Sequence, residues 1–347
     1  YRPVALAFLF IALIARGWTA HAAEEEIIYS PNGKPVFDFG YRDEDYYGNV
    51  IWDIGDDEYD AIRQALRYGA GYWAEVLEAG LKNSIPAPII VYGDHRLNAS
   101  ASSPQSDLLS DYTLLGAMLI KGWQPDEDEA VGEIEIGNWY PYYGASGTDD
   151  PAFYYNGPIT HLPKNGDQMH LASTMLHEIA HALGIGSTAF NNTYFSNTLN
   201  LWDKNLRDAN GNPAQPGQLI SATNTPGSFY VPTGGGPTFA GKNVMEVLDG
   251  AMPAGIPIWG WENDAEFSHI ELRNSKMNHG QLLQNYATFM SAELAVQQDP
   301  GYQFERMQNY SRYIYNDDAT IPNEQGIYYA DTAGIGQPAY GPECKVQ

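Results

Sequence analysis

The stretch LASTMLHEIAHALG, residues 171–184, carries the strongest structural signal in this chain. Its apolar residues continue a helical spacing that begins near residue 167, and Gly184 is suited to end a helix. On such a helix His177 and His181 differ by about 40° in direction and about 6 Å in rise, so both imidazoles can project toward one point. Glu178 follows the first of them directly. The stretch therefore predicts a helix that carries two imidazoles and a carboxylate close together.

These three residue types suit a zinc site. Zn²⁺ prefers imidazole nitrogens at about 2.0–2.1 Å, and His177 and His181 can supply two of them. The Glu178 carboxylate can reach a metal-bound water without occupying a coordination position. An isolated match to this pattern also arises by chance on an ordinary amphipathic helix. However, two His and a Glu on a helix otherwise lined with Met, Leu and Ile are costly to bury without a metal. We therefore predict Zn²⁺ at His177 and His181, with Glu178 as general base.

Several segments downstream of this helix carry a family resemblance. They are FAGKNV at 239–244, IPI at 256–258, SHIE at 268–271 and SKMNH at 275–279. Together with the helix they resemble the leishmanolysin-like branch of the metzincin zinc peptidases. The later segments FMSAEL and DPGY, at 289–294 and 299–302, look like the closing helix and ending shared with matrixins and serralysin-like enzymes. The resemblance covers residues 60–302.

The resemblance implies which residue completes the metal site. In most metzincins a third His follows three residues after the helix-ending glycine, but this chain has Ser187 there. In the leishmanolysin-like branch an insertion precedes the third ligand, which usually lies in a Ser-His pair, and this implies His269. Carboxylates nearby would instead make a His-His-Glu site. These rival candidates are Glu262, Glu266 and Glu271.

The resemblance also implies a turn below the metal and a fold. Met277 would lie in the methionine-bearing turn, and His279 occupies the place where some metzincins put a tyrosine that swings toward the transition state. His279 is therefore a candidate catalytic residue. The implied fold is α+β: a mixed twisted sheet with a long backing helix and an active-site helix, followed by a smaller C-terminal lobe with the Met-turn and a closing helix.

The patterns elsewhere predict the elements of this fold. Apolar residues on one face predict a helix over 60–81, and short β-prone runs predict strands over 89–92 and 132–139. Residues 98–112 have the composition of a surface loop, and 282–298 predict a third helix. An extended peptide is expected to lie along the edge of the strand at 132–139 through backbone hydrogen bonds.

The chain divides into five expected segments. They are a signal peptide at 1–23, an N-terminal catalytic subdomain at 24–186, a loop-rich insertion at 187–268, a C-terminal subdomain at 269–316 and a tail of unassigned role at 317–347. The signal peptide is predicted from Arg2, an apolar run too short for a membrane span, and small residues at 20–23. We therefore expect a secreted, extracellular or cell-surface protein.

Composition limits the partners. The 347 residues are 44% hydrophobic, which is enough for a sizeable core. The net charge of −25 disfavours nucleic acid and anionic membrane surfaces; it favours solubility and could supply oxygen ligands for Ca²⁺. Cys344 is the only cysteine, so the catalytic body is expected to lack disulfides.

Two functions follow from this reasoning. The first is a secreted zinc metalloendopeptidase that acts on protein or peptide substrates by attack of zinc-bound water. The alternative is a non-catalytic cell-surface binding or adhesion protein that retains the fold, with Ser187 and the long insertion as signs of lost catalysis. Glu178 favours the enzyme, because a binding protein has no need of a base between two zinc ligands. The sequence predicts no oligomeric state.

Overall fold

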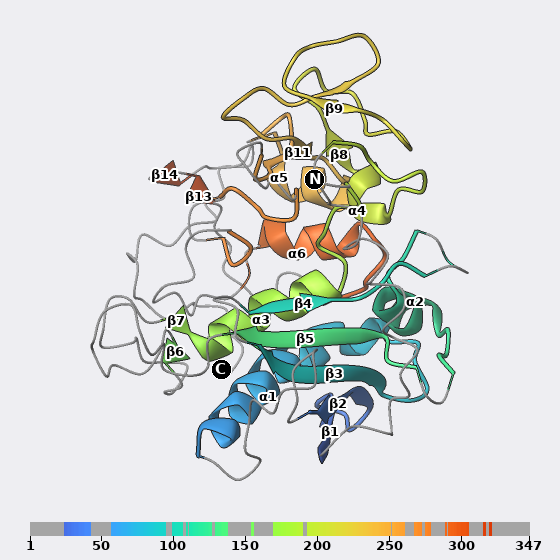
Figure 1. Ribbon diagram of the computed structural model, residues 1–347, viewed down its shortest axis with the longest axis vertical. Coiled ribbons are helices and arrows are strands. Elements are labelled where there is room, and N and C mark those ends of the chain that lie inside the picture. The colour runs from blue at the N-terminus through green and yellow to red at the C-terminus, as the bar shows by residue number, and fades with distance from the viewer. Residues whose placement is uncertain are drawn as a thin grey trace, which may run out of the picture.

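The chain has a mixed α+β architecture (Figure 1). The computed structural model describes residues 24–42, 57–94, 99–106, 109, 111–126, 129–137, 154–155, 169–189, 193–250, 252–260, 267–272, 275–278, 289, 291–304, 315–316 and 319–320. Within these residues a mixed sheet and six α-helices confirm the α+β class. The predicted signal peptide and most of the tail lie outside the described residues. No helix in the described ranges has the length and apolarity needed to cross a bilayer.

The large sheet has five strands in the order β1-β2-β3-β5-β4. Its strands are β1 (Glu24–Tyr29), β2 (Pro35–Tyr41), β3 (Ala87–Asp94), β5 (Gly132–Gly137) and β4 (Ser100–Ser102). The central strands β2, β3 and β5 run parallel, while β1 and β4 pair antiparallel at the two edges. The strands predicted at 89–92 and 132–139 are thus confirmed, with shifted ends.

The edge of the sheet differs from the expectation. The range 98–112 was expected to be a loop, but it contains the short strand β4. β5 pairs with β3 on one side and β4 on the other, so the prediction that residues 132–139 offer a free edge to substrate is wrong. The physical reason is that β5 needs a second partner for its backbone groups, and Ser100–Ser102 supply it. Among the described strands, β4 is the edge on this side.

Two helices pack closely against each other beside the sheet. The predicted long helix is α1 (Asp57–Leu77), which continues as the 3₁₀ helix η2 (Glu78–Gly80), and it packs on α3 (Leu171–Ala182). A Cβ on Gly69 of α1 would lie 3.1 Å from the backbone of α3, so the glycine allows this approach. The indole of Trp73 donates a hydrogen bond to the Leu176 carbonyl at 3.1 Å.

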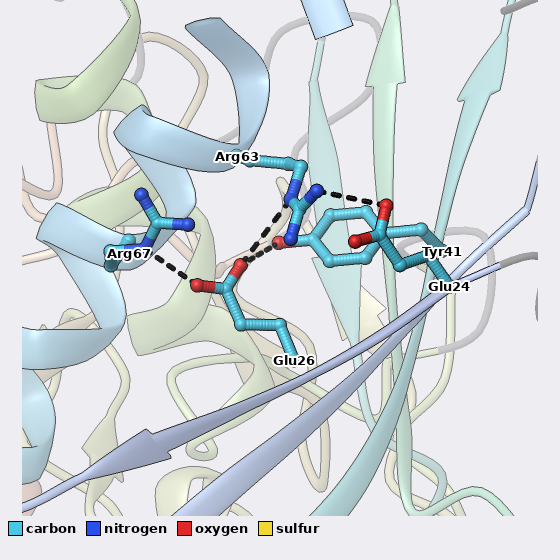
Figure 2. A network of polar contacts seen from close by, with 5 residues as sticks. All are labelled: Glu24, Glu26, Tyr41, Arg63 and Arg67. Atoms are coloured by element: carbon cyan, nitrogen blue, oxygen red, sulfur yellow. Dashed lines mark hydrogen bonds and ion pairs between the residues drawn. The ribbon is translucent and has the colours of Figure 1, made fainter. Parts of the chain in front are cut away.

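Charged side chains fasten α1 to β1 and β2 at the rim of this core (Figure 2). Arg63 forms ion pairs with Glu24 at 2.8 Å and Glu26 at 3.6 Å, and Arg67 pairs with Glu26 at 2.5 Å. The Tyr41 hydroxyl donates to Glu26 at 3.0 Å. Burial lowers the pKa of Arg63, but the two carboxylates outweigh this and leave it raised. The network ties the helix to the first two strands of the sheet.

The remaining described elements are short. They are α2 (Leu114–Lys121), β6 (Tyr154–Tyr155), β7 (Met169–His170), α4 (Leu201–Lys204), β8 (Leu206–Arg207), β9 (Ile220–Ser221), β10 (Phe229–Tyr230), β11 (Thr238–Phe239), α5 (Lys242–Leu248), β12 (Ile256–Pro257), α6 (Ser291–Gln298), β13 (Tyr315–Asn316) and β14 (Ala319–Thr320). The helix predicted over 282–298 is confirmed only as α6, because residues 279–288 lie outside the described ranges. Figure 1 shows α3 between the large sheet and α6, where the two halves of the molecule meet.

Candidate metal centre

Three histidines converge where α3 meets the C-terminal half. His177 and His181 come from α3, and His269 comes from residues 267–272, which form no helix and contribute only an isolated bridge at Ile270. One ring nitrogen from each lies within 4.8 Å of the others. The ring centroids are 4.6 Å apart for His177 and His181, 4.9 Å for His181 and His269, and 5.3 Å for His177 and His269. The structure thus brings together the two histidines of the helix motif and the third one implied by the resemblance.

Backbone carbonyls orient the two helix imidazoles. The Nδ1 atoms of His177 and His181 each lie 2.6 Å from a carbonyl oxygen, of Lys276 and Ile185 respectively. With Nδ1 donating its hydrogen, Nε2 keeps the lone pair that a metal requires. The two Nε2 atoms are 2.9 Å apart. Two nitrogens on one tetrahedral zinc ion would lie about 3.3 Å apart, so the observed pair is close to ligand spacing.

Desolvation keeps these rings neutral. It is the largest cause that lowers the pKa of His177, to well below the ordinary value, and the neighbouring His181 and His269 lower it further. Desolvation also lowers the pKa of His181 to about 4. Both imidazoles are therefore unprotonated at neutral pH, which is the form that binds metal. His177 is buried while His181 and His269 are only half-buried, so one side of the cluster is accessible.

Two hydrogen bonds hold the backbone of the segment that carries His269. The His269 carbonyl accepts a hydrogen bond from the Trp259 backbone at 2.8 Å. The Trp202 indole of α4 donates to the Phe267 carbonyl at 2.6 Å. Phe267 adopts a φ of 44°, a left-handed conformation that is unfavourable for a bulky residue. These contacts fix an irregular stretch of backbone immediately before the third histidine.

A tight turn links the ligands. Met277 is fully buried, and its carbonyl accepts from the Ile270 backbone at 2.8 Å, next to His269. The preceding residue, Lys276, provides the carbonyl that orients His177. The turn at residues 275–278 therefore contacts His177 through the Lys276 carbonyl and the residue after His269 through the Met277 carbonyl. The turn contains Met277, whose place below a metal ion stays a prediction.

Ser187 has a different role from that of a ligand. Its hydroxyl donates to Asp203 at 2.6 Å, and the Thr188 backbone donates to the same carboxylate at 2.9 Å. Burial raises the pKa of Asp203 to about 6, although these hydrogen bonds oppose the shift. Sequence reasoning missed Asp203, because nothing local distinguishes it from a solvated acidic residue.

The other candidates are placed as follows. Glu178 lies within α3 and is 6% exposed. Glu271 is described but does not belong to the cluster of converging donors. His279, Glu262 and Glu266 lie outside the described residues, so their predicted roles stay predictions.

The segment Asp299-Pro-Gly-Tyr302 joins the two halves around this centre. Asp299 accepts hydrogen bonds from the backbone of Asn243 at 2.7 Å and Val244 at 3.3 Å, at the start of α5. The Tyr302 hydroxyl donates to the Leu183 carbonyl at 3.0 Å, at the end of α3. Each end of this short segment is thus tied to a different half.

The donor set fits a metal ion. Three converging imidazoles, two of them kept neutral by burial and oriented by carbonyls, match the ligand chemistry of Zn²⁺, and imidazole also suits copper, nickel and iron. The three histidines could therefore hold a metal ion whose identity the geometry leaves open. Comparisons of the chain with protein-family models, curated proteins and solved structures give no match.

Proposed function

We propose that this protein is a secreted zinc-dependent metalloendopeptidase of the metzincin type. The observation that carries the proposal is the convergence of His269 on the two imidazoles of α3, with ring nitrogens within 4.8 Å of one another. A third ligand from a distant segment, with one side open, is the arrangement of catalytic rather than structural zinc sites.

Each protein group has a defined task in the proposed reaction. His177, His181 and His269 would hold Zn²⁺, which when bound supplies a Lewis acid and lowers the pKa of water toward about 7. Glu178 accepts the proton of the attacking water and passes it to the leaving amine as the peptide bond breaks. Its burial, at 6% exposure, favours proton transfer because little solvent competes for the carboxylate.

Substrate is proposed to bind along β4 rather than β5. β4 is an edge strand of three residues that contacts α3, the helix of the metal ligands. An extended peptide can add to such an edge through its backbone, which brings a scissile bond near the site without selecting particular side chains.

Calcium binding is a further expectation from the acidic composition. In the ranges that the structure describes, the histidine triad is the one group of converging metal donors. A calcium site would therefore have to involve residues beyond those ranges or a looser set of oxygen ligands.

The experiment compares metal content and casein hydrolysis in the wild type, Glu178→Gln and His181→Gln. We expect Glu178→Gln to retain one equivalent of zinc and to lose activity by about 10²–10⁴-fold, because only the base is removed. His181→Gln should lose both zinc and activity. A wild type that is loaded with zinc but inert on casein would instead favour the non-catalytic binding protein.

A further inference from the structure

A fully buried lysine lies directly behind the metal centre. Lys276 belongs to the turn at 275–278, and its Nζ contacts the Ser173 hydroxyl in the first turn of α3. Glu293 of α6 is also fully buried, and its charge favours the lysine ammonium. Desolvation is nevertheless the larger effect and lowers the pKa of Lys276 to about 7. The proposed reaction uses none of these groups.

Stability alone gives a poor account of this cluster. Removing two charges from water is costly, and replacing a buried ion pair by apolar side chains of similar volume is often neutral or stabilising. The neighbouring buried residues Met277 and Leu294 show that the surroundings accept apolar side chains. Lys276 and Glu293 therefore call for an explanation other than the strength of the core.

The contacts of the cluster point to one peptide unit. Glu293 accepts hydrogen bonds from the Ser275 hydroxyl at 2.5 Å and the Met277 backbone at 3.1 Å. The Lys276 side chain reaches α3 at Ser173. The peptide unit between Lys276 and Met277 is thus held by α6 through the Met277 N–H and by α3 through the Lys276 side chain. The carbonyl of that peptide accepts the Nδ1 hydrogen of His177 at 2.6 Å.

We propose that Lys276, together with Glu293 and Ser173, is a positioning group that fixes the carbonyl orienting His177 and thereby sets the metal affinity of the site. An outer hydrogen bond of this kind fixes the tautomer and direction of a ligand ring, and its loss typically weakens metal binding about 10–100-fold. The inference rests on the metal centre of the proposed function, but not on peptide hydrolysis.

The test is the double variant Lys276→Met/Glu293→Gln. Methionine keeps the length of the side chain without charge, and glutamine keeps an oxygen that can accept from Ser275 and Met277. We expect the metal-free variant to unfold at the same or a higher urea midpoint than the wild type. Its zinc affinity, measured by competition with a chromophoric chelator, should fall about 10–100-fold. The visible absorption bands of the Co²⁺-loaded protein should shift, because the ligand geometry changes.

Lys34→Met is the matched control, since it removes a lysine that donates to the Leu81 carbonyl at 2.8 Å far along the chain from the histidines. It should leave zinc affinity and the cobalt bands unchanged. Unchanged affinity and cobalt bands in the double variant would overturn the inference. If the double variant is less stable, the cobalt spectrum of its folded fraction decides, and unshifted bands again overturn it. A wild type that binds no zinc removes the inference and the metal centre together, whereas one that binds zinc without hydrolysing peptides removes only the proposed function.

Discussion

The region before residue 187 and the region after it are held together by different means. The first consists of a five-stranded sheet and long helices, whose backbone groups are satisfied by regular ladders. The described residues of the second form strands of two residues and short helices. There, three aspartates accept hydrogen bonds from backbone N–H groups that no helix or strand ladder satisfies. Asp203 accepts from residue 188, Asp208 from residues 210 and 212, and Asp299 from residues 243 and 244.

This difference explains how the candidate metal centre is built. The regular region supplies two histidines at fixed helical spacing, so their geometry follows from α3 itself. The irregular region supplies His269, whose geometry depends on individual contacts such as the Trp202 indole on the Phe267 carbonyl. We therefore expect disruption of the first region to act through global stability, and disruption of the second to act locally.

The largest effect is expected at Trp73 in the regular region. Its buried indole packs 4.9 Å from the Phe289 ring and bonds to the backbone of α3. Trp73→Ala should lower the free energy of unfolding by about 3–5 kcal/mol, because it leaves a large cavity. Urea denaturation followed by circular dichroism measures this. Truncation of the exposed Tyr194 in the irregular region is the control and should change stability by less than about 0.5 kcal/mol. A similar loss in both variants would remove the contrast between the regions.

The second effect is on pH dependence. The pKa of His181 is about 4 in the folded protein against an ordinary value of 6.5, so between these values the unfolded chain binds a proton that the folded protein does not. The metal-free protein should therefore lose stability as pH falls from 6.5 toward 4, by about 1.4 kcal/mol per pH unit for each such group. Asp203 acts in the opposite sense, because its pKa is raised to about 6.

Two variants separate these contributions. In urea titrations with a chelator present, His181→Gln should flatten the loss of stability toward low pH. Asp203→Asn should steepen it, because the folded protein no longer gains a proton at that site. If the slope of His181→Gln equals that of the wild type, the ring is not desolvated as described.

The third effect is local to the irregular region. Asp299→Ala removes the acceptor for the first backbone N–H groups of α5 and should cost about 1–2 kcal/mol. Hydrogen exchange should accelerate in residues 242–248 and stay unchanged in α1. Asp299→Asn keeps an acceptor oxygen and should retain most of the protection. Uniform acceleration in both regions would show that they unfold as one unit.

The sequence predicted what depends on local spacing. The candidate active-site helix and its two histidines follow from a period of 3.6 residues, and so does α1. The predicted start near residue 167 is wrong, because Met169–His170 pair with Tyr154–Tyr155 as β7 and the helix begins at Leu171. The strand β4 was missed because Ser-Ala-Ser has little β propensity and is strand only through its pairing with β5. α5 was missed because its N-terminus is capped by Asp299, which is remote in sequence.

The residues that hold the site in place could not be predicted from local sequence either, because their roles depend on contacts with distant residues. Lys276 and Glu293 read as ordinary charged residues in sequence, and only tertiary contacts reveal that both are fully buried. His269 was reached through the resemblance of its segment and not through any spacing with His177 and His181. Its place in the cluster depends on how the irregular region folds back.

The smallest expected change in stability is also the most direct comparison of the regions. Trp202→Phe and Trp73→Phe each remove one indole hydrogen bond to a carbonyl, of Phe267 at 2.6 Å and of Leu176 at 3.1 Å. Each should cost about 1 kcal/mol. Leu176 lies inside α3, whose backbone ladder holds its ligands regardless, so Trp73→Phe should leave zinc affinity unchanged. Phe267 has a left-handed φ and lies two residues before His269, so Trp202→Phe should weaken zinc binding about tenfold in a chelator competition assay. Equal zinc affinities in the two variants would mean that the irregular region holds its ligand as firmly as the helix does.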